Sequence, residues 1–531
     1  MRIIYHARIY TFDTRNPVAS AIAIEGDRVA AVGDDFEILN HFSHRADLLD
    51  AGNFTIIPGL IDAHIHLEQY ALSLQKVDCE TTTRRECLRR IEERAAVTQP
   101  GEWILGHGWN QNNWPDGFGT AEELDRVAPD HPVFLTAKSL HAAWANSPAL
   151  SAAGITLDSP DPAGGSIQRT HSGQPSGILY ESAMQLVARA IPQPTPEQRV
   201  TAIQSAISRL SSMGLTAIHD FDQRDCFVAL QGLHNRGELN IRVLKSIPLV
   251  DLPHASALGL HTGFGDLLLR IGNVKIFTDG ALGPRTAAML QPYDNDPENL
   301  GLLTMDARAL LEIAYQAVKS SFSLAVHAIG DRANREVLDA FTELKTLQHS
   351  DGALQLAPPF RHRIEHVQLI HPADTARLAA LGVIASMQPL HATSDMDMAD
   401  KFWGTRSANA YAWSSLSKQG AVLAFGSDAP VESPDPFAGL YAAVTRRRAN
   451  GAPSPDGWYT DQRLSIQQAL QAYTLGPAYA AGLENQQGRL SPGYLADLVL
   501  LEHDLFHCDA NQLMQIRPTA TMLGGKWIYQ A

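Results

Sequence analysis

The chain has 531 residues, of which 45% are hydrophobic and 19% charged, a balance typical of a folded globular protein rather than a disordered or fibrous one. Its formal net charge of −15 argues against nucleic acid as a partner, because the phosphate backbone would repel it. The length exceeds one ordinary domain and suffices for a large barrel with accessory parts.

The cysteines and the hydropathy pattern bear on the compartment. Cys79, Cys87, Cys226 and Cys508 are scattered without a Cys-x-x-Cys pair, which disfavours a disulfide framework or a structural zinc knuckle. The N-terminus lacks a signal-peptide core, and no apolar run reaches the roughly 18 residues needed to cross a bilayer. We therefore expect a cytoplasmic protein with no membrane partner. A homodimer is among the assemblies that the sequence leaves open.

Both ends of the chain carry short segments in which apolar and polar residues alternate. These segments are residues 8–12, 21–24, 29–33, 495–501 and 520–523. Period-two alternation with Gly and Asp at the turns predicts antiparallel strands. Because neither end has enough apolar surface for its own core, we expect residues 1–54 and 482–531 to pair into one small composite β-sandwich.

Between the two ends, short apolar runs alternate with helical patterns, which predicts parallel strands joined by helices. Eight candidate strands lie at about residues 55–63, 215–219, 241–248, 273–277, 323–327, 362–366, 383–387 and 422–426. Thr195-Pro196-Glu197-Gln198 has the pattern of a capping box with proline at the first helical position. Together these features predict an α/β fold with a (β/α)₈ TIM-like barrel over residues 55–70 and 196–481.

One connection is anomalous. About 150 residues separate the first candidate strand from the second, far more than a normal strand-to-helix connection needs. The stretch is rich in Trp, Asn, Gly and Pro, especially over residues 106–115. We therefore expect residues 71–195 to form an inserted subdomain near the active-site mouth of the barrel.

The strongest local signal for chemistry is the pair His64-Ile65-His66 at the end of the first candidate strand. In a strand the two imidazoles project from one face, roughly 6–7 Å apart at Cα, and can converge on one cation. The pair alone is weak evidence. Four later candidate strands, however, also end in potential ligands, namely Lys275, His327, His366 and Asp428. Because barrel enzymes gather their chemistry at the C-terminal strand ends, this set predicts a site for Zn²⁺ or another borderline divalent metal.

These residues and the segments around them resemble the amidohydrolase superfamily, in particular its YtcJ-like (amidohydrolase 3) branch, which includes N-substituted formamide deformylase. The resembling segments are His64-x-His66 and residues 275–286, 327–333, 426–431 and 488–497. The resemblance covers nearly the whole chain, and its five separate motifs stand in the right order. The resemblance also implies the composite terminal sandwich and the insertion after the first strand.

The resemblance further implies two divalent metal ions, expected as Zn²⁺. Their ligands would be His64, His66, Lys275, His327, His366 and Asp428, with the first two on one ion and His327 and His366 on the other. In related enzymes a lysine at the place of Lys275 can be N6-carboxylated, a carbamate that bridges the ions. The alternative is an unmodified Lys275 that pairs with Asp279 or another acid beside a single ion.

The implied activity is hydrolysis of a C–N, amide-like bond in a small non-peptide substrate, with esters and cyclic amides as further options. The metal would lower the pKa of bound water and so supply hydroxide as nucleophile, while Asp428 would shuttle the proton to the departing amine. His327 and His366 complete the expected catalytic set. Two alternatives stay open, a mononuclear deaminase-type amidohydrolase and a catalytically silent regulatory or binding protein on the same barrel.

Four residues are predicted to contact the substrate, namely His141, Trp109, Gln111 and Arg285. His141 lies in a segment, residues 140–147, that is similar to one of the family. Together with Trp114, Trp109 and Gln111 could form an aromatic and amide-bearing wall, although a plain core of the insertion explains them equally well. Arg285 could bind an anionic group or pair with Asp279.

Two further segments are expected to have no part in the chemistry. Residues 391–395 follow the seventh strand at the end of the barrel that carries the expected site, but they are expected to form a loop that faces solvent. The motif around Asp497 is expected to be structural.

Overall fold

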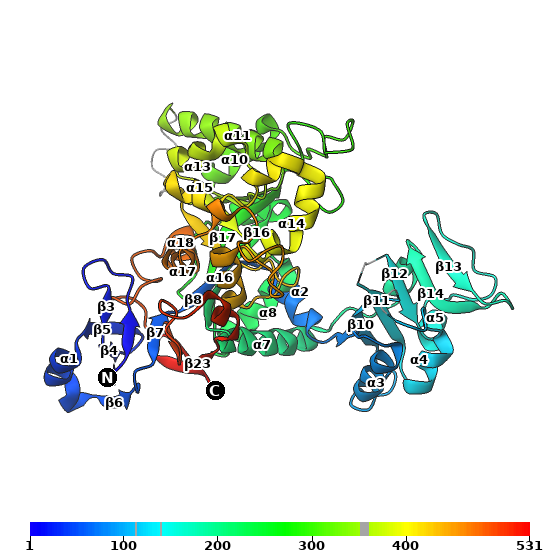
Figure 1. Ribbon diagram of the computed structural model, residues 1–531, viewed down its shortest axis with the longest axis horizontal. Coiled ribbons are helices and arrows are strands. Elements are labelled where there is room, and N and C mark those ends of the chain that lie inside the picture. Colours follow the sequence, from blue (N-terminus) through cyan, green and yellow to red (C-terminus); the bar gives the residue numbers. More distant parts are fainter. Residues whose placement is uncertain (112–113, 139–140, 351–359) are drawn as a thin grey trace. The chain divides into compact units, whose positions relative to one another are not determined.

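The computed structural model describes residues 1–111, 114–138, 141–350 and 360–531. The chain forms two compact units, one of Met1–Tyr70 with Ile203–Ala531 and the other of Ala71–Ala202. Helices, strands and chain direction can be followed in Figure 1. Within the described residues, no helix has both the length and the apolar character that a membrane span requires.

The larger unit is built around an eight-stranded parallel sheet with the order β21-β20-β19-β18-β17-β16-β15-β8. Its strands are β8 (Leu60–Ile65), β15 (Leu215–Asp220), β16 (Arg242–Pro248), β17 (Leu269–Phe277), β18 (Leu324–Ala328), β19 (Arg363–His366), β20 (Ile384–Met387) and β21 (Leu423–Phe425). Neighbours in the chain are neighbours in the sheet, as in a (β/α)₈ barrel. The predicted α/β barrel class is confirmed.

The helices of the larger unit alternate with these strands, except α1, which lies between strands of the N-terminal segment. They are α1 (Asp35–Phe42), α2 (Leu67–Ser73), α7 (Pro196–Ser212), α8 (Arg224–Asn235), α9 (Leu252–Ala257), α10 (Ala307–Lys319), α11 (Asp331–Ser350), α13 (Thr375–Leu381), α14 (Pro389–Trp403), α15 (Trp413–Lys418), α16 (Pro436–Thr445), α17 (Ile466–Ala472) and α18 (Leu475–Ala480). The predicted capping box opens α7, because the Gln198 amide donates to Thr195 Oγ1 at 3.2 Å and the Thr195 amide to Gln198 Oε1 at 2.9 Å.

The barrel closes through the residues that follow β21. The Asp428 amide donates to the His64 carbonyl at 2.7 Å, and the His66 amide donates to the Ala429 carbonyl at 2.9 Å. Gly426 makes this approach possible, since a Cβ there would lie 2.4 Å from the His64 amide nitrogen. The closure places the residues after the last strand beside the end of the first.

Strands from the two ends of the chain build two further sheets, with the orders β5-β4-β1-β6 and β24-β23-β22-β7-β2-β3. Their bounds are β1 (Arg2–Tyr5), β2 (Arg8–Tyr10), β3 (Val18–Ala19), β4 (Ala21–Glu25), β5 (Arg28–Gly33), β6 (Asp47–Asp50), β7 (Thr55–Pro58), β22 (Leu498–Leu501), β23 (Pro518–Leu523) and β24 (Lys526–Gln530). One apolar cluster contains Ile4 and Ile22 of the first sheet and Ile56, Leu498 and Met522 of the second. The two incomplete ends thus share a core.

The prediction of one barrel strand over about residues 55–63 was wrong. Thr55–Pro58 is strand β7, which pairs with β22 and β2 in the terminal sheet, and only Leu60–Ile65 enters the barrel. Gly59 lies between them, where a Cβ would be 2.3 Å from Thr216 Oγ1. The apolar run is continuous because one segment serves two sheets, which periodicity alone does not reveal.

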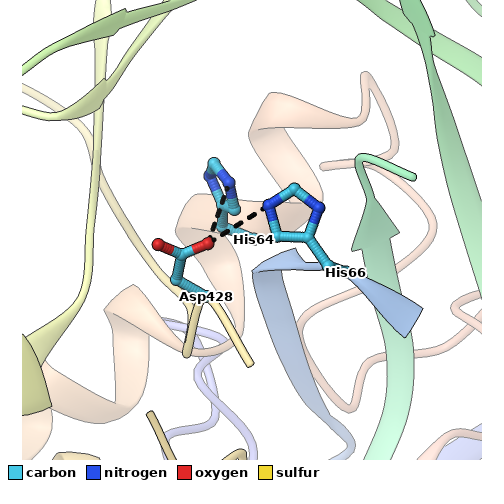
Figure 2. A group of neighbouring side chains, drawn as sticks. All are labelled: His64, His66 and Asp428. Carbon is cyan, nitrogen blue, oxygen red and sulfur yellow. Dashed lines mark ion pairs between the residues drawn. The ribbon is translucent and has the colours of Figure 1, made fainter. Parts of the chain in front are cut away.

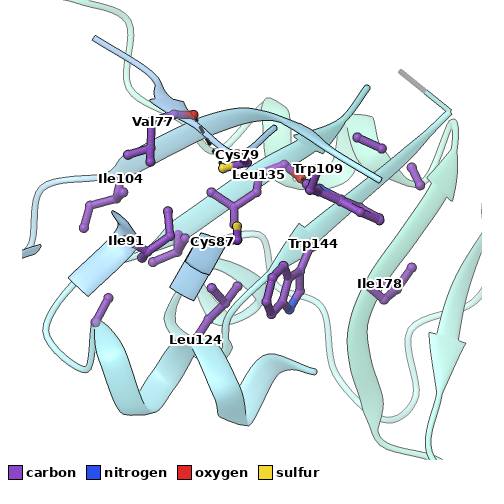
Figure 3. Close-up of a cluster of buried hydrophobic side chains, with 14 of the residues drawn as sticks. Val77, Cys79, Cys87, Ile91, Ile104, Trp109, Leu124, Leu135, Trp144 and Ile178 are labelled. Atoms are coloured by element: carbon purple, nitrogen blue, oxygen red, sulfur yellow. Dashed lines mark hydrogen bonds between the residues drawn. The ribbon is translucent and has the colours of Figure 1, made fainter. Parts of the chain in front are cut away.

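The smaller unit has its own six-stranded sheet, β13-β14-β12-β11-β10-β9. Its elements are β9 (Val77–Asp78), α3 (Arg84–Ala95), β10 (Ile104–Trp109), α4 (Ala121–Val127), β11 (Val133–Ala137), β12 (Ala142–Ala145), α5 (Ser147–Ala152), β13 (Gly165–Arg169), β14 (Pro175–Glu181) and α6 (Met184–Ala188). Figure 3 shows part of its core, where Trp109, Trp144 and Leu135 pack near the free thiols of Cys79 and Cys87. Its predicted place near the mouth of the barrel stays a prediction.

A buried ion pair ties the barrel to the terminal sheet. Arg242 Nε and Nη2 donate to the two Asp497 oxygens at 2.7 and 2.8 Å, and Asp497 Oδ1 also accepts the Gly524 amide. Because Asp497→Ala leaves Arg242 charged and buried, we expect it to lower the free energy of unfolding by about 3–5 kcal/mol, measured by chemical denaturation. The exposed pair Arg308–Glu312 is the control, and Glu312→Ala should change stability by less than about 0.5 kcal/mol. Equal effects of the two changes would contradict a structural role for Asp497.

Burial of His362, just before β19, predicts an acid-sensitive fold. Burial lowers the pKa of His362 from 6.5 to about 4. The unfolded chain therefore binds more protons between these values, and stability should fall as the pH falls from about 6.5 towards 4. His362→Asn keeps an acceptor for the Leu324 amide, which now donates to Nδ1 at 3.2 Å, but removes the titration. We expect a shallower loss of denaturation midpoint between pH 7 and pH 5 in this variant; an identical slope would contradict the assignment.

Candidate metal centre

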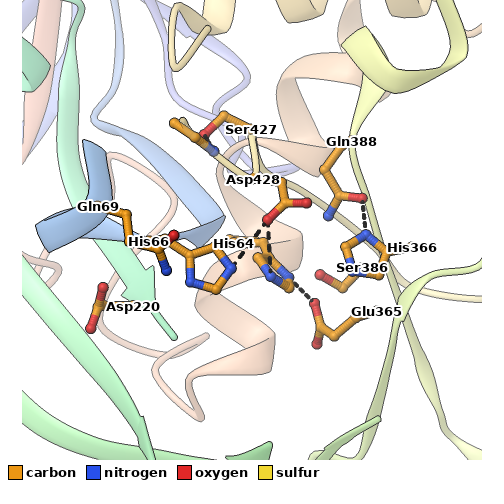
Figure 4. Close-up of polar contacts among 12 residues, drawn as sticks. His64, His66, Gln69, Asp220, Glu365, His366, Ser386, Gln388, Ser427 and Asp428 are labelled. Atoms are coloured by element: carbon orange, nitrogen blue, oxygen red, sulfur yellow. Dashed lines mark hydrogen bonds and ion pairs between the residues drawn. The ribbon is translucent and has the colours of Figure 1, made fainter. Parts of the chain in front are cut away.

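The six predicted ligands lie at the C-terminal ends of the barrel strands or directly after them. His64 belongs to β8, Lys275 to β17, His327 to β18 and His366 to β19, while His66 and Asp428 follow β8 and β21. Parallel strands deliver their C-terminal ends to one edge of a barrel. Figure 4 shows His64, His66, His366 and Asp428 pointing into one basin.

His64, His66 and Asp428 have the spacing of co-ligands. The Nε2 atoms of His64 and His66 lie 3.5 and 3.4 Å from Asp428 Oδ1 (Figure 2). Both separations exceed an ordinary N–H···O hydrogen bond, but they match the roughly 3.3 Å between two ligand atoms on a tetrahedral Zn²⁺ with bonds near 2.0–2.1 Å. One ligand atom from each of the three residues lies within 4.8 Å of the others.

Carboxylates engage the other nitrogen of these two imidazoles. His64 Nδ1 lies 2.6 Å from Glu365 Oε2, and His66 Nδ1 lies 3.3 Å from Asp222 Oδ1. A carboxylate holds the proton on Nδ1 and leaves the Nε2 lone pair for a metal. Nε2 of His64 is buried without a hydrogen-bond partner among the described residues, which is costly unless a ligand binds there.

The two later histidines are oriented by amide oxygens, although His327 Nε2 also lies 3.5 Å from Asp279 Oδ1. His327 Nε2 donates to the Gly280 carbonyl at 2.9 Å, and His366 Nδ1 lies 2.9 Å from Gln388 Oε1. These contacts leave Nδ1 of His327 and Nε2 of His366 as the nitrogens that can bind a cation. The two rings are neighbours, with centroids 4.7 Å apart.

The electrostatics of the basin suit a divalent cation. Burial and the nearby Lys275 ammonium lower the pKa of His64 and of His327 to about 4, so both imidazoles are neutral at pH 7, the form that binds metal. Burial opposes protonation of His66, but the Asp222 and Asp428 carboxylates outweigh it and raise its pKa to about 9. The basin therefore favours positive charge at His66, as expected where a cation would bind.

Lys275 is buried among aromatic rings rather than paired with an acid. Its Nζ lies 4.7 Å from the centroid of Phe221 and 5.0 Å from that of Phe277. Burial lowers its pKa to about 8, against the attraction of Glu365 and Asp428. Within the described residues no carboxylate forms an ion pair with this ammonium, so the predicted alternative of a Lys275–Asp279 pair was wrong.

Asp279 is used by the backbone instead. Its oxygens accept the amides of Ala288, Ile329 and Gly330 at 2.8–3.0 Å. A carboxylate with three amide donors is satisfied without a cationic partner. This also excludes the predicted Arg285–Asp279 pair, since Arg285 Nη1 binds Asp296 Oδ2 at 2.7 Å.

A buried Arg363–Glu365 pair supports His64 and was not predicted. Arg363 Nε donates to Glu365 Oε1 at 2.5 Å, and its Nη2 donates to Glu365 Oε2 at 3.0 Å and to the Ala63 carbonyl at 2.6 Å. Arg363 is completely buried. The signal in the sequence was the Arg-x-Glu spacing in a strand, which puts both side chains on the face opposite Ile364.

The prediction of a solvent-facing loop over residues 391–395 was wrong. Pro389 occupies the first turn of α14, as prolines often do, and this places His391 within the helix. His391 is only 6% exposed, and its Nε2 lies 3.8 Å from Asp428 Oδ2. The strand-seven end of the barrel therefore contributes an imidazole that the sequence pattern alone did not identify.

The predicted substrate contacts fall into two groups. Trp109 is fully buried in the core of the smaller unit, where Nε1 donates to the Leu135 carbonyl, so the alternative of a plain core residue describes it. His141 is exposed beside Glu181, and Gln111 lies in a turn. Substrate contact stays a prediction for His141, Gln111 and Arg285. Residues 112, 113 and 140 of the predicted segments lie outside the described residues.

Comparison with known proteins identifies the family. Residues 47–529 match the model of the amidohydrolase family. The chain belongs to this family. It is 30% identical to the putative amidohydrolase YtcJ of Bacillus subtilis, with 100% of both chains covered, and 29% identical to N-substituted formamide deformylase of Arthrobacter pascens, with 99% of this chain and 98% of the relative covered. The predicted resemblance to this branch is confirmed.

A solved structure supports the same assignment. The crystal structure of an uncharacterized metal-dependent hydrolase from Pyrococcus furiosus superposes with a TM-score of 0.78 at 28% sequence identity, over 95% of this chain and 99% of that one. The chain is thus an amidohydrolase-family member with the fold of metal-dependent hydrolases. Its candidate ligands stand where a barrel of this kind carries its chemistry.

The Glu365–His64 contact yields a test of the site. We expect Glu365→Gln to weaken cation binding about 10–100-fold, because the neutral amide no longer holds the proton on Nδ1 as firmly and leaves Arg363 unpaired. Competition with a chromophoric chelator measures the affinity. Glu484→Gln, which weakens a partly buried pair with Arg361 outside the basin, is the matched control and should bind cations as the parent does. Unchanged affinity in Glu365→Gln would contradict the orienting role.

Proposed function

We propose that this amidohydrolase-family protein hydrolyses a C–N, amide-like bond of a small non-peptide substrate with the help of two divalent cations, expected as Zn²⁺. The observation that carries the proposal is the convergence of His64, His66 and Asp428 at co-ligand spacing, with the other nitrogen of each imidazole held by a carboxylate. The 29% identity to an N-substituted formamide deformylase supports an amide-like substrate.

The ligands would divide between two positions. His64, His66 and Asp428 would hold one cation, and His327 and His366 would hold the other. Lys275 would lie between them as an N6-carboxylated bridge. With its pKa near 8, a fraction of Lys275 is the neutral amine at neutral pH, which is the form that adds to carbon dioxide and releases a proton. An unmodified ammonium beside two dications would be strongly disfavoured.

When bound, the cations lower the pKa of a water molecule towards neutrality and polarise the substrate carbonyl. The residues of the chain then handle the proton. His64, His66 and His366 keep the pKa of the Asp428 carboxyl well below its usual value against the effect of burial, so Asp428 is ionised and can accept the proton of the attacking water. It returns this proton to the departing amine nitrogen, which leaves as a neutral amine.

The backbone holds Asp428 ready for this role. Its amide donates to the His64 carbonyl, and its φ of 60° lies in the left-handed region that residues other than glycine seldom adopt. His366, with φ of 76°, has its backbone in the same left-handed region. Such conformations cluster at functional sites, where the surrounding structure maintains them.

Asp428→Asn tests the proposal together with metal removal. We expect chelation to abolish hydrolysis of aryl formamides, amides or lactams and Zn²⁺ to restore it. Asp428→Asn should lower kcat by about 10²–10⁴-fold, because the amide cannot accept the proton. Asp374→Asn, at a buried carboxylate paired with Arg335 and Arg377, is the control and should retain activity.

The two remaining alternatives predict different results in the same assay. A mononuclear deaminase-type enzyme would bind one ion per chain with Lys275 unmodified, and metal analysis would report the single ion. A regulatory or binding protein would bind metal but turn over none of these substrates. Activity that survives complete chelation would overturn the proposal.

A further inference from the structure

His391 is a buried imidazole for which neither the family resemblance nor the proposed mechanism has a use. Its side chain is 8% exposed, yet neither Nδ1 nor Nε2 has a hydrogen-bond partner among the described residues. A buried polar group without partners costs free energy, so natural structures retain few of them. Such a residue at the edge of a metal basin indicates a ligand that completes its contacts.

The position of His391 is the one expected of a residue that binds a cation. One ligand atom each from His366, His391 and Asp428 lies within 4.8 Å of the other two. The 3.8 Å between His391 Nε2 and Asp428 Oδ2 is too long for a hydrogen bond but close to the spacing of two ligands on one ion. The rings of His366 and His391 are stacked with centroids 6.0 Å apart.

A single turn of chain organises this group. Gln388 ends the connection from β20 and accepts from His366 Nδ1 at 2.9 Å, which leaves Nε2 of His366 for the cation. Pro389 then starts α14, and His391 follows within the first helical turn. The β20–α14 junction thus both orients one ligand and supplies another.

His327 does not fill the same place. Its contact with the Gly280 carbonyl leaves Nδ1 for a cation, but no group of three ligand atoms within 4.8 Å in the described part of the chain includes His327. His327 and His366 alone would give the second cation only two protein ligands. Catalytic zinc sites commonly have three protein ligands and an open position.

We propose that His391 is a protein ligand of the second cation, in a site made of His366, His391 and Asp428. This inference rests on the proposed function, because it assigns a ligand to the second of its two cations. Asp428 would then contribute Oδ1 to the first ion and Oδ2 to the second. Each carboxylate oxygen has a further lone pair, so Asp428 can still accept a proton.

The test begins with metal stoichiometry. The full-length protein, its His391→Asn and His64→Asn variants, and His362→Asn as a matched buried-histidine control are freed of metal and titrated with Zn²⁺ against a chromophoric chelator. We expect two ions in the parent and in His362→Asn. In His391→Asn the weaker ion should lose at least tenfold in affinity while the other is kept, and His64→Asn should show the converse.

A second experiment distinguishes loss of a ligand from poor folding of the His391→Asn variant, because it looks for a new spectroscopic band. In the Co²⁺-loaded His391→Cys protein, a thiolate ligand would produce a sulfur-to-cobalt charge-transfer band in the near ultraviolet, and His362→Cys should show none. Absence of the band in folded His391→Cys would overturn the inference, and so would unchanged affinities in His391→Asn. A parent that binds a single ion would overturn the two-cation proposal and, with it, the assignment of His391 to a second cation. A parent that binds no cation would overturn the proposed function as well.

Discussion

The backbone contact that closes the barrel is the constraint on which the site depends. Asp428 and Ala429 hydrogen-bond to the backbone of His64 and His66, so the last strand position is set in register against the first. The contact needs Gly426, because any side chain there would collide with the His64 backbone. The closure holds the backbone of Asp428 in the left-handed region. This conformation costs on the order of 1–3 kcal/mol, and the surrounding hydrogen bonds maintain it.

Around this closure the barrel arranges buried charge so that it converges on one basin. Arg363 neutralises Glu365, Glu365 holds the proton of His64 on Nδ1, and the opposite nitrogen of His64 faces Asp428. Each of these charges would destabilise the fold if it were buried alone, but here each has a partner. The chain of contacts also fixes the direction in which the lone pair of the His64 imidazole points. The arrangement prepares the site for a cation before one binds.

In the insertion, residues 71–195, the tryptophans serve a different purpose from the one that the composition suggested. Its tryptophans suggested a wall for a substrate, yet Trp109 and Trp114 are buried in the core of a unit with its own sheet. A segment that folds as a separate unit needs large apolar side chains for that purpose alone. Aromatic content therefore indicated a core here, and a role for the exposed His141 remains a prediction.

The sequence by itself predicted the barrel, seven of its strands and the six candidate ligands, because strand periodicity and residue type are local and each ligand lies at a strand end. It did not separate the first barrel strand, β8, from β7. It also indicated the family, because the motifs that carry the resemblance are short and continuous in the sequence. Only the tertiary structure decided which side chains support the ligands. Glu365 meets His64 across 301 positions of the chain, and His391 approaches Asp428 because Pro389 starts a helix where a loop was expected. The direction of a side chain in a barrel depends on closure and on contacts between strands that are distant in the chain, and neither leaves a pattern in the local sequence.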